Sequence, residues 1–281
     1  MAYKSIFTVA TNRAQVVLGI SGAARLAVAN DGHLDVLALG VDRTQVGYSY
    51  VGSGAVMMQV ALERAEAEAR DLEKAAKAAL AAEGPDLRSG SEAAVAQLGA
   101  LADLVAQRAR FADLVVLPRP YGKDQGAEDE AVVEAAMFEG QAPVLVLPAS
   151  GLSTATPKRV VIAWNQSREA MTAVRRALPF LKAAEMVDIT VVDPPSHGPE
   201  RSDPGGLLCQ MLVRHGVRAE VSVLAKTLPR VSDVLARHVR DRDADLLVMG
   251  AYGHSRFREA ILGGATRNML EQAEVPVLMA H

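Results

Sequence analysis

Four glycines near the C-terminus have the type and spacing of an anion-binding loop. They lie in the run GAYGHSRFREAILGGATRN, residues 250–268, at Gly250, Gly253, Gly263 and Gly264. Glycine lets a backbone turn sharply and approach a ligand without a Cβ in the way. The run continues into ATRNMLEQA, which has the pattern of the first turns of a helix, and the unpaired N–H groups of a helix N-terminus bind anions. The predicted chemistry is therefore a phosphate cradle, to which Thr266 adds a hydroxyl.

Residues 254–262, between the glycines, have the spacing of a short amphipathic helix. Phe257, Ile261 and Leu262 fall on one face and would anchor the segment against a sheet. Long basic side chains on such a segment are more often solvated than bound to a phosphate, and His254 is the candidate that we retain. The alternative for the whole run is a turn of small residues that the fold keeps without a ligand.

The chain repeats itself, and the repeat defines the elements that must position this run. ADLVVLPRPY from Ala112 parallels ADLLVMGAYG from Ala244, and APVLVLP from Ala142 parallels VPVLMAH from Val275. Further upstream, SIFTVATN parallels RVVIAWN, and LDVLALGVD parallels VDITVVD. Self-similarity in this order predicts two copies of one fold. The linker PASGLSTATPKR separates them, so we expect one domain at residues 1–150 and a second at residues 157–281.

Each half alternates short apolar runs with segments of helical spacing. The runs are continuous, as in parallel strands buried on both faces, and in the second half they are Val160–Trp164, Ile189–Val192, Leu246–Met249 and Pro276–Met279. This alternation predicts an α/β fold made of two tandem doubly wound parallel-sheet domains, each of about five strands with flanking helices. The first half is longer by about 20 residues, which predict one long helix near Val56–Ala82.

The glycine run follows a strand of the second half, and ligands of open α/β sheets bind outside the carboxyl ends of the strands. Its spacing, Gly250-x2-Gly253-x9-Gly263, resembles the G-x2-G-x9-G-[S/T] pattern of the nucleotide-binding members of the universal stress protein family. The resemblance covers the whole chain as a tandem pair. It implies a Rossmann-like variant of the adenine-nucleotide-hydrolase type that binds ATP or another adenine nucleotide, with or without Mg²⁺.

The resemblance also implies roles for single residues of the second half. Asn165 stands where an acidic residue usually faces the nucleotide, and an equal alternative is that Asn165 only stabilises a turn. Ala163 and Val192 stand at the positions that contact adenine, and Gly264 replaces the usual Ser or Thr, which removes one hydroxyl. The full set of candidate nucleotide-binding residues is Ala163, Asn165, Val192, Met249, Gly250, Gly253, His254, Gly263, Gly264, Ala265 and Thr266.

The first half provides a comparison within the same chain. With an offset of 132 residues, the four cradle glycines correspond to Pro118, Tyr121, Ala131 and Val132. Glu128, Asp129 and Glu130 lie at or near the start of the equivalent helix, where they would stabilise the helix dipole and repel phosphate. We therefore expect the first half to bind no nucleotide. Because members of the family commonly dimerise, we expect it to act as a covalently attached pairing partner.

Other motifs are weaker. RSGSEA at residues 88–93 faintly resembles a phosphate loop of ATP pyrophosphatases, and we interpret it instead as the N-cap of a helix. Cys209 has the pattern of a small buried hydrophobe, and Trp164 that of a residue packed beside a strand end. The histidines show no pairing or Cys/His clustering that predicts a metal site.

Composition narrows the class of protein. The 281 residues contain one cysteine and no long apolar run, and the start MAYKSIFTVATNRAQ lacks a signal pattern, so we expect a cytoplasmic protein that binds no membrane. Residues 1–150 contain 13 Lys and Arg and 19 Asp and Glu, whereas residues 151–281 contain 17 Lys and Arg and 14 Asp and Glu. The second half therefore has the more positive net charge, and a polyanion would bind there rather than to the first half.

These features lead to a regulatory, nucleotide-binding hypothesis for a stress response, with self-association or an unidentified protein as partner and no nucleic acid. The alternative from a different class is a nucleotide-free interaction or scaffold module of the same fold. Slow ATP hydrolysis is disfavoured, because Asn165 replaces an acidic residue and no general base is evident. No catalytic residue is therefore predicted.

Overall fold

The computed structural model describes residues 2–43, 54–122, 125–194, 202–251 and 265–281. The chain forms two compact units, one from Tyr3 to Ala142 and one from Pro143 to His281. Within the described residues, no helix is both long and apolar enough to cross a membrane.

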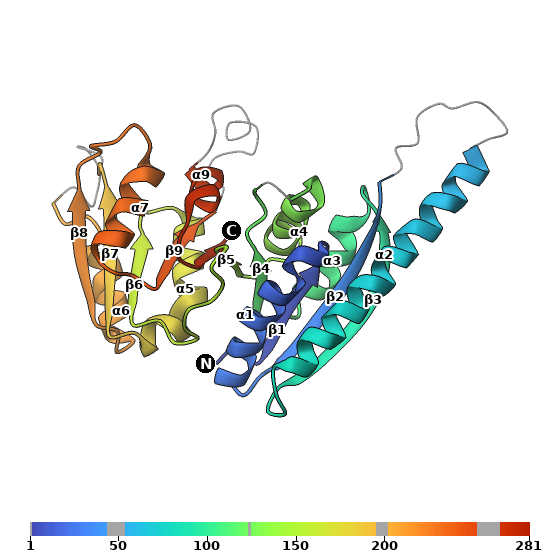
Figure 1. Ribbon diagram of the computed structural model, residues 1–281. Helices are drawn as coiled ribbons and strands as arrows, with labels where there is room; N and C mark the ends of the chain where they lie inside the picture. The colour runs from blue at the N-terminus through green and yellow to red at the C-terminus, as the bar shows by residue number, and fades with distance from the viewer. Residues whose placement is uncertain (1, 44–53, 123–124, 195–201, 252–264) are drawn as a thin grey trace. The chain divides into compact units, whose positions relative to one another are not determined.

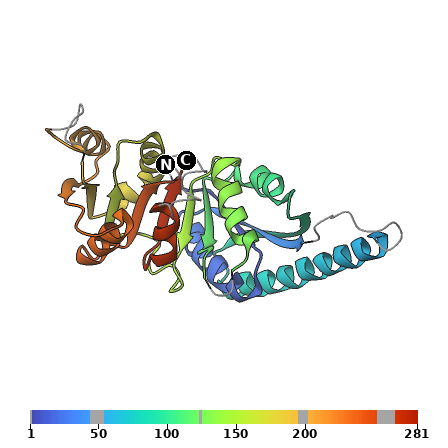
Figure 2. The same ribbon diagram turned by 90° about the horizontal axis from the view of Figure 1, so that it is seen from above.

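The first unit is a parallel sheet of the order β3-β2-β1-β4 with helices on both faces (Figures 1 and 2). The pair α1 and α2 covers one face, and the pair α3 and α4 covers the other (Figure 2). In chain order its elements are β1 (Ser5–Ala10), the 3-10 turn η1 (Arg13–Gln15), α1 (Val16–Ala29), β2 (His33–Asp42), α2 (Gly54–Ala82), β3 (Arg88–Gln97), α3 (Leu101–Ala109), β4 (Leu114–Pro118) and α4 (Ala127–Phe138).

The second unit has the strand order β5-β10-β9-β6-β7-β8. All neighbouring strands are parallel except β5, which pairs antiparallel with β10. Its elements are β5 (Val144–Leu147), β6 (Arg159–Ala163), α5 (Arg168–Ala183), β7 (Met186–Val192), α6 (Gly206–Arg214), β8 (Ala219–Leu224), α7 (Val231–Asp241), β9 (Leu246–Gly250), α9 (Ala265–Gln272) and β10 (Val277–Ala280) (Figure 1).

The predicted fold class is confirmed, because both units are doubly wound α/β sheets. The strands are distributed differently from the expected five in each half. APVLVLP, which ends the first copy of the repeat, forms β5, and β5 lies in the second unit beside β10, the strand formed by the corresponding VPVLMAH. The division between the units therefore falls at residues 142 and 143, before the linker at residues 148–159.

The interpretation of RSGSEA as a helix N-cap is wrong, because these residues begin strand β3. All ten residues of β3 pair in register with β2, from His33 opposite Arg88 to Asp42 opposite Gln97. Hydrogen bonding to the ten-residue strand β2 outweighs the local preference of Ser and Gly for turns and helix caps.

Helix α5 shows why these sequences fold locally as they do. Ser167 is its N-cap, and the Ser167 hydroxyl accepts a hydrogen bond from the Ala170 N–H at 3.1 Å. The apolar positions at helical spacing are buried against the sheet, and they are Ala170, Ala173, Val174, Ala177, Phe180 and Leu181. This packing fixes the first turn of α5 beside the carboxyl ends of β6 and β9.

Candidate functional site

The carboxyl ends of three parallel strands meet in the second unit. Ala163 at the end of β6 is paired with Met249 of β9 on one side and with Thr190 of β7 on the other. In the sheet, β7 and β8 lie on one side of β6, and β9 and β10 lie on the other. The chain thus adds strands first on one side of β6 and then on the other, so the strand order reverses at β6. Such a reversal is the usual place for a ligand crevice in open α/β sheets.

The candidate residues that the structure describes converge on this edge. Ala163, Val192 and Met249 are at or next to strand ends, and α9 starts at Ala265 shortly after β9 ends. Ala163 and Val192 are half-buried, whereas Met249 and Thr266 are buried. Gly253, His254, Gly263 and Gly264, together with the short helix expected at residues 254–262, lie outside the described residues.

Asn165 takes part in the turn that follows β6. Its side-chain Oδ1 accepts a hydrogen bond from the Ser167 N–H at 3.1 Å, and the residue is exposed. Gln166 between them has a φ of 63°, in the left-handed region that residues other than glycine rarely adopt. Asn165 therefore stabilises a tight turn leading to the N-cap Ser167, the simpler of its two expected roles.

Gly250 is required by packing inside the second unit. A Cβ built on Gly250 would lie 2.4 Å from the backbone N of Ala170 and 2.7 Å from the backbone C of Glu169. The end of β9 thus lies directly against the first turn of α5, with no room for a side chain. Close approach to a ligand is not needed to explain this glycine.

Helix α9 begins at the same edge without an acidic residue in its first turn. Thr266 is 2 % exposed, so its side chain faces the interior. Nη1 of Arg230, the N-cap residue of α7, donates a hydrogen bond to Oδ1 of Asn268 at 3.3 Å. The N–H groups at the start of a helix favour an anion, and no acidic side chain in this first turn opposes one.

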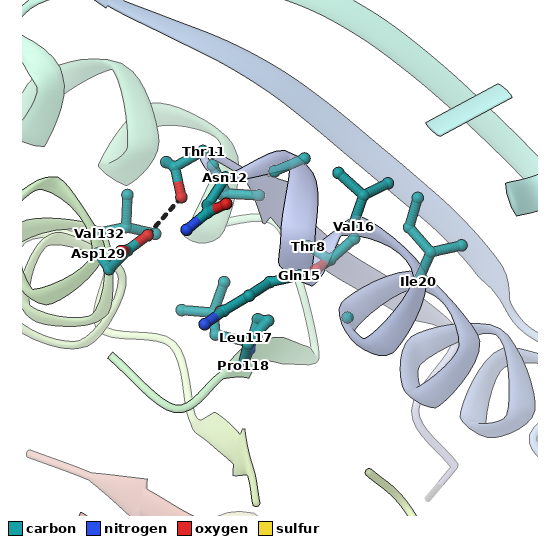
Figure 3. A pocket seen from close by; sticks show the side chains of 13 residues that line it. Thr8, Thr11, Asn12, Gln15, Val16, Ile20, Leu117, Pro118, Asp129 and Val132 are labelled. Atoms are coloured by element: carbon teal, nitrogen blue, oxygen red, sulfur yellow. Dashed lines mark hydrogen bonds between the residues drawn. The ribbon is translucent and has the colours of Figure 1, made fainter. Parts of the chain in front are cut away.

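At the corresponding strand ends of the first unit, a pocket of about 440 Å³ lined by Thr11, Asn12, Arg43 and Asp129 adjoins a narrow crevice (Figure 3). Thr8, Thr11, Asn12, Gln15, Pro118 and Asp129 are among the residues that line the crevice. The crevice has a volume of about 20 Å³, which is room for about one water molecule. Ligand pockets of nucleotide size are more than ten times larger, at roughly 300 Å³ or more.

Asp129 closes this crevice from the first turn of α4. The hydroxyl of Thr11, just after β1, donates to Oδ1 of Asp129 (Figure 3), and the N–H of Gly126 donates to Oδ2 at 2.9 Å. Burial raises the pKa of the Asp129 carboxyl above its ordinary value, although these two hydrogen bonds act in the opposite direction. A carboxylate of the chain itself therefore occupies a helix N-terminus of the kind that binds phosphate.

The other two acidic residues of α4 are also engaged inside the first unit. Glu128 forms an ion pair with Arg43, and Arg43 also pairs with Glu68 of α2 at 3.1 Å. The hydroxyl of Tyr121 donates to Glu130 at 2.9 Å. Each of the three acidic residues at the start of the helix, expected from the sequence to repel phosphate, is thus held by a partner within the first unit.

Sequence reasoning missed a buried polar cluster on β7. Asp188 is 4 % exposed, and its Oδ2 lies 3.0 Å from His238 Nε2 and 2.9 Å from Arg242 Nε. The hydroxyls of Thr190 and Ser222 donate to the two oxygens of the same carboxylate. An aspartate inside the apolar run VDITVV is the signal that could have revealed it, because a buried charge needs partners. No group of three or more His, Cys, Asp or Glu side chains in the described part of the chain is arranged to hold a metal ion.

Comparison with known proteins identifies the relatives of the second half. Residues 156–281 match the model of the Universal stress protein family. A universal stress protein of Synechocystis sp. is 28% identical over 141 residues, which are 48% of this chain and 46% of that protein. The chain therefore spans about half the length of this curated relative.

Solved structures extend the likeness in fold to the whole chain. The crystal structure of a universal stress protein from Archaeoglobus fulgidus covers 99% of this chain and 97% of its own, with a TM-score of 0.69 at 14% identity. A universal stress protein family protein from Arabidopsis thaliana, solved with AMP bound, covers 44% of this chain and 91% of its own, with a TM-score of 0.33 at 20% identity. At that distance the AMP is a fact about that protein alone.

Proposed function

We propose, from the match of residues 156–281 to the model of the Universal stress protein family, that this half of the chain binds an adenine nucleotide, ATP or a relative, and acts as a regulatory protein. The phosphates would lie at the first turn of α9 and the glycine run that precedes it, and the base would lie near Ala163 and Val192. The first half would bind no nucleotide.

The difference between the two helix N-termini carries this proposal. In the first unit, Asp129 supplies a negative charge at the start of α4, and the crevice beside it has a volume of about 20 Å³. In the second unit, α9 starts without an acidic residue and follows a glycine-rich run with the spacing of nucleotide-binding family members. The first copy therefore carries its own carboxylate at this helix N-terminus, and the second retains the groups that attract an anion.

The antiparallel pairing of β5 with β10 lies inside the second unit, and it motivates a role for the first copy of the repeat as a pairing partner because β5 ends that copy. These strands are the last strand of each copy of the repeat, and they pair from Val144 opposite Met279 to Val146 opposite Val277. An antiparallel pair of equivalent strands is the arrangement that two identical subunits form around a two-fold axis. A tandem chain achieves it without a second molecule.

The experiment is to purify the protein without denaturation, release any bound nucleotide with acid and identify it by mass spectrometry. Titration calorimetry with ATP, in the presence and absence of Mg²⁺, then measures affinity and stoichiometry. We expect one nucleotide per chain. Two nucleotides per chain would contradict the assignment to one half, and no nucleotide with no heat of binding would overturn the proposal.

The choice of variant decides whether the glycines bind ligand or only shape the fold. Gly250 is unsuitable because its packing against Ala170 makes any substitution a folding defect. Gly253→Leu and Gly263→Leu test the run itself, with Gly99→Leu as the control, because a Cβ at Gly99 meets nothing within 4 Å. We expect the variants at Gly253 and Gly263 to lose nucleotide while the fluorescence of the buried Trp164 stays that of the wild type.

A nucleotide-free interaction module of the same fold is the second candidate function. It is favoured by two observations, namely that packing alone explains Gly250 and that turn formation explains Asn165. The same titration separates the two candidates, because a module of this kind gives no heat with ATP, ADP, AMP or cyclic AMP.

A further inference from the structure

Strand β3 forms an edge of the sheet of the first unit, and its outer side is open. It pairs with β2 over all ten residues, and no described strand lies on its other side. Proteins usually protect such an edge with Pro, Lys, a bulge or a short strand, because unpaired N–H and C=O groups recruit another strand. The sequence RSGSEAAVAQ has neither Pro nor Lys, its pairing is regular, and Arg88, Ser89, Glu92 and Ala93 are exposed.

The first five residues of β3 are complementary to themselves when reversed. Arg88-Ser89-Gly90-Ser91-Glu92 places a positive and a negative side chain at equal distances from a central glycine. In an antiparallel pair centred on Gly90, Arg88 would lie opposite Glu92 of the partner subunit, and the same pair would recur on the other side of the axis. A stretch of about five residues has the length of an average strand.

The side chains of this stretch are arranged so that a second strand can approach. Arg88, Gly90 and Glu92 alternate onto one face of the sheet, and Ser89 and Ser91 alternate onto the other. At the centre, Gly90 has no side chain, and its Cβ position has only Asp35 and His33 side-chain atoms within 4 Å. Within the chain, Arg88 pairs with the exposed Asp31 and Glu92 pairs with Arg108 at 2.8 Å, so cross-strand pairing would share or exchange these partners.

We propose that a second copy of this chain pairs antiparallel with residues 88–92 and forms a two-fold homodimer through β3. The occupant is a second copy rather than an unrelated strand, because the charge pattern is satisfied on both sides of the axis by the same sequence in reverse. Strand β8, at the edge of the second unit, lacks this pattern in its sequence AEVSVL. The inference does not depend on nucleotide binding, because it uses only residues of the first unit.

Charge reversal tests the register directly. In the proposed dimer, position 88 of each chain faces position 92 of the other, which gives two such pairs. Arg88→Glu turns both pairs into Glu–Glu pairs, and Glu92→Arg turns both into Arg–Arg pairs. We expect each variant to weaken the dimer by about tenfold or more in Kd, measured by sedimentation equilibrium, because two attractive cross-strand pairs become repulsive. The double variant Arg88→Glu/Glu92→Arg restores opposite charges and should dimerise like the wild type.

Mixing the two single variants provides the decisive control. Within residues 88–92, the Arg88→Glu chain carries two negative charges and the Glu92→Arg chain carries two positive charges. Each chain therefore repels its own copy and complements the other, so the mixture should form a heterodimer although each chain alone does not. Val223→Glu on the exposed face of β8 is the matched control and should leave the dimer intact.

Several outcomes would overturn the proposal. A monomeric wild type at the highest soluble concentration excludes the dimer, and single variants that dimerise like the wild type place the interface elsewhere. Monomeric single variants that fail to associate when mixed would refute the pairing of position 88 with position 92. Amide hydrogen exchange adds a local measurement, since residues 88–92 should exchange more slowly in the dimer than in the single variants.

Discussion

The hydroxyl of Thr11 donates a hydrogen bond to a carboxylate oxygen of Asp129, which joins the end of β1 to the first turn of α4. The other oxygen of Asp129 accepts a hydrogen bond from the N–H of Gly126, so one side chain caps the helix and closes the crevice at the strand ends. The second half has no acidic residue in the first turn of α9. The two copies of the repeat therefore differ in charge where a ligand would bind.

Removal of the Asp129 carboxylate should destabilise the first unit. Asp129→Ala leaves the Gly126 N–H and the Thr11 hydroxyl without their acceptor, which costs about 1–2 kcal/mol of the free energy of unfolding. Urea denaturation followed by circular dichroism measures this change. Asp103→Ala is the matched control, since Asp103 is an exposed acid in the first turn of α3, and we expect a change below about 0.5 kcal/mol. Equal costs for the two variants would contradict a capping role.

The stability of the chain should depend on pH through Asp129. Burial raises the pKa of this carboxyl in the folded state above its ordinary value of 3.8, so the folded chain binds the proton more tightly than the unfolded chain. Stability contributed by Asp129 is therefore greatest at low pH and falls as the pH rises through the folded pKa. Asp129→Asn cannot ionise at this position. As the pH rises through the folded pKa of Asp129, the unfolding free energy of the wild type should therefore fall relative to that of the variant. A shift in the opposite direction would contradict the raised pKa.

Substitution of Gly250 should disturb the second unit whether or not a ligand binds there. Gly250→Ala places a Cβ 2.4 Å from the backbone N of Ala170, which forces β9 and α5 apart and costs about 1–3 kcal/mol. The fluorescence of Trp164, the only tryptophan, follows unfolding of this unit. Gly99→Ala meets no atom within 4 Å and should be nearly neutral. If Gly250→Ala unfolds like the wild type but loses nucleotide, the ligand and not the packing explains the glycine.

The fold was predictable because its signals are repeated and local. Continuous apolar runs identified the buried strands, although not β3, and the long helix expected near Val56–Ala82 is α2, Gly54–Ala82. The partner of a strand is not a local property, however. The apolar run of β5 does not specify that it pairs with β10, and the Ser and Gly of β3 suggest a cap until the ten-residue β2 is placed beside them.

The strand ends that frame the candidate site were predictable, whereas the contacts made by its residues were not. The carboxyl ends of β6, β7 and β9 follow from the strand order. The role of Gly250 depends on Ala170, far earlier in the chain, and that of Asp129 depends on Thr11. Contacts of this kind arise only when distant segments pack, so no spacing rule in one segment reveals them.

The buried carboxylate of Asp188 should be essential for the stability of the second unit. Its oxygens contact His238, Arg242, Thr190 and Ser222, so Asp188→Ala leaves the buried Thr190 hydroxyl and the buried His238 ring without this acceptor. The expected loss is about 1–3 kcal/mol in the free energy of unfolding, measured by urea denaturation with Trp164 fluorescence.

Glu220 provides the control for that loss, because it pairs with the same Arg242 at 3.0 Å from a more exposed position on β8. Glu220→Ala should cost less than about 1 kcal/mol, since water solvates both charges when the pair is lost. Similar costs for the two variants would mean that Asp188 contributes only as an ion pair with Arg242. A much larger cost for Asp188→Ala would show that the buried carboxylate holds β7, β8 and α7 together through all of its donors.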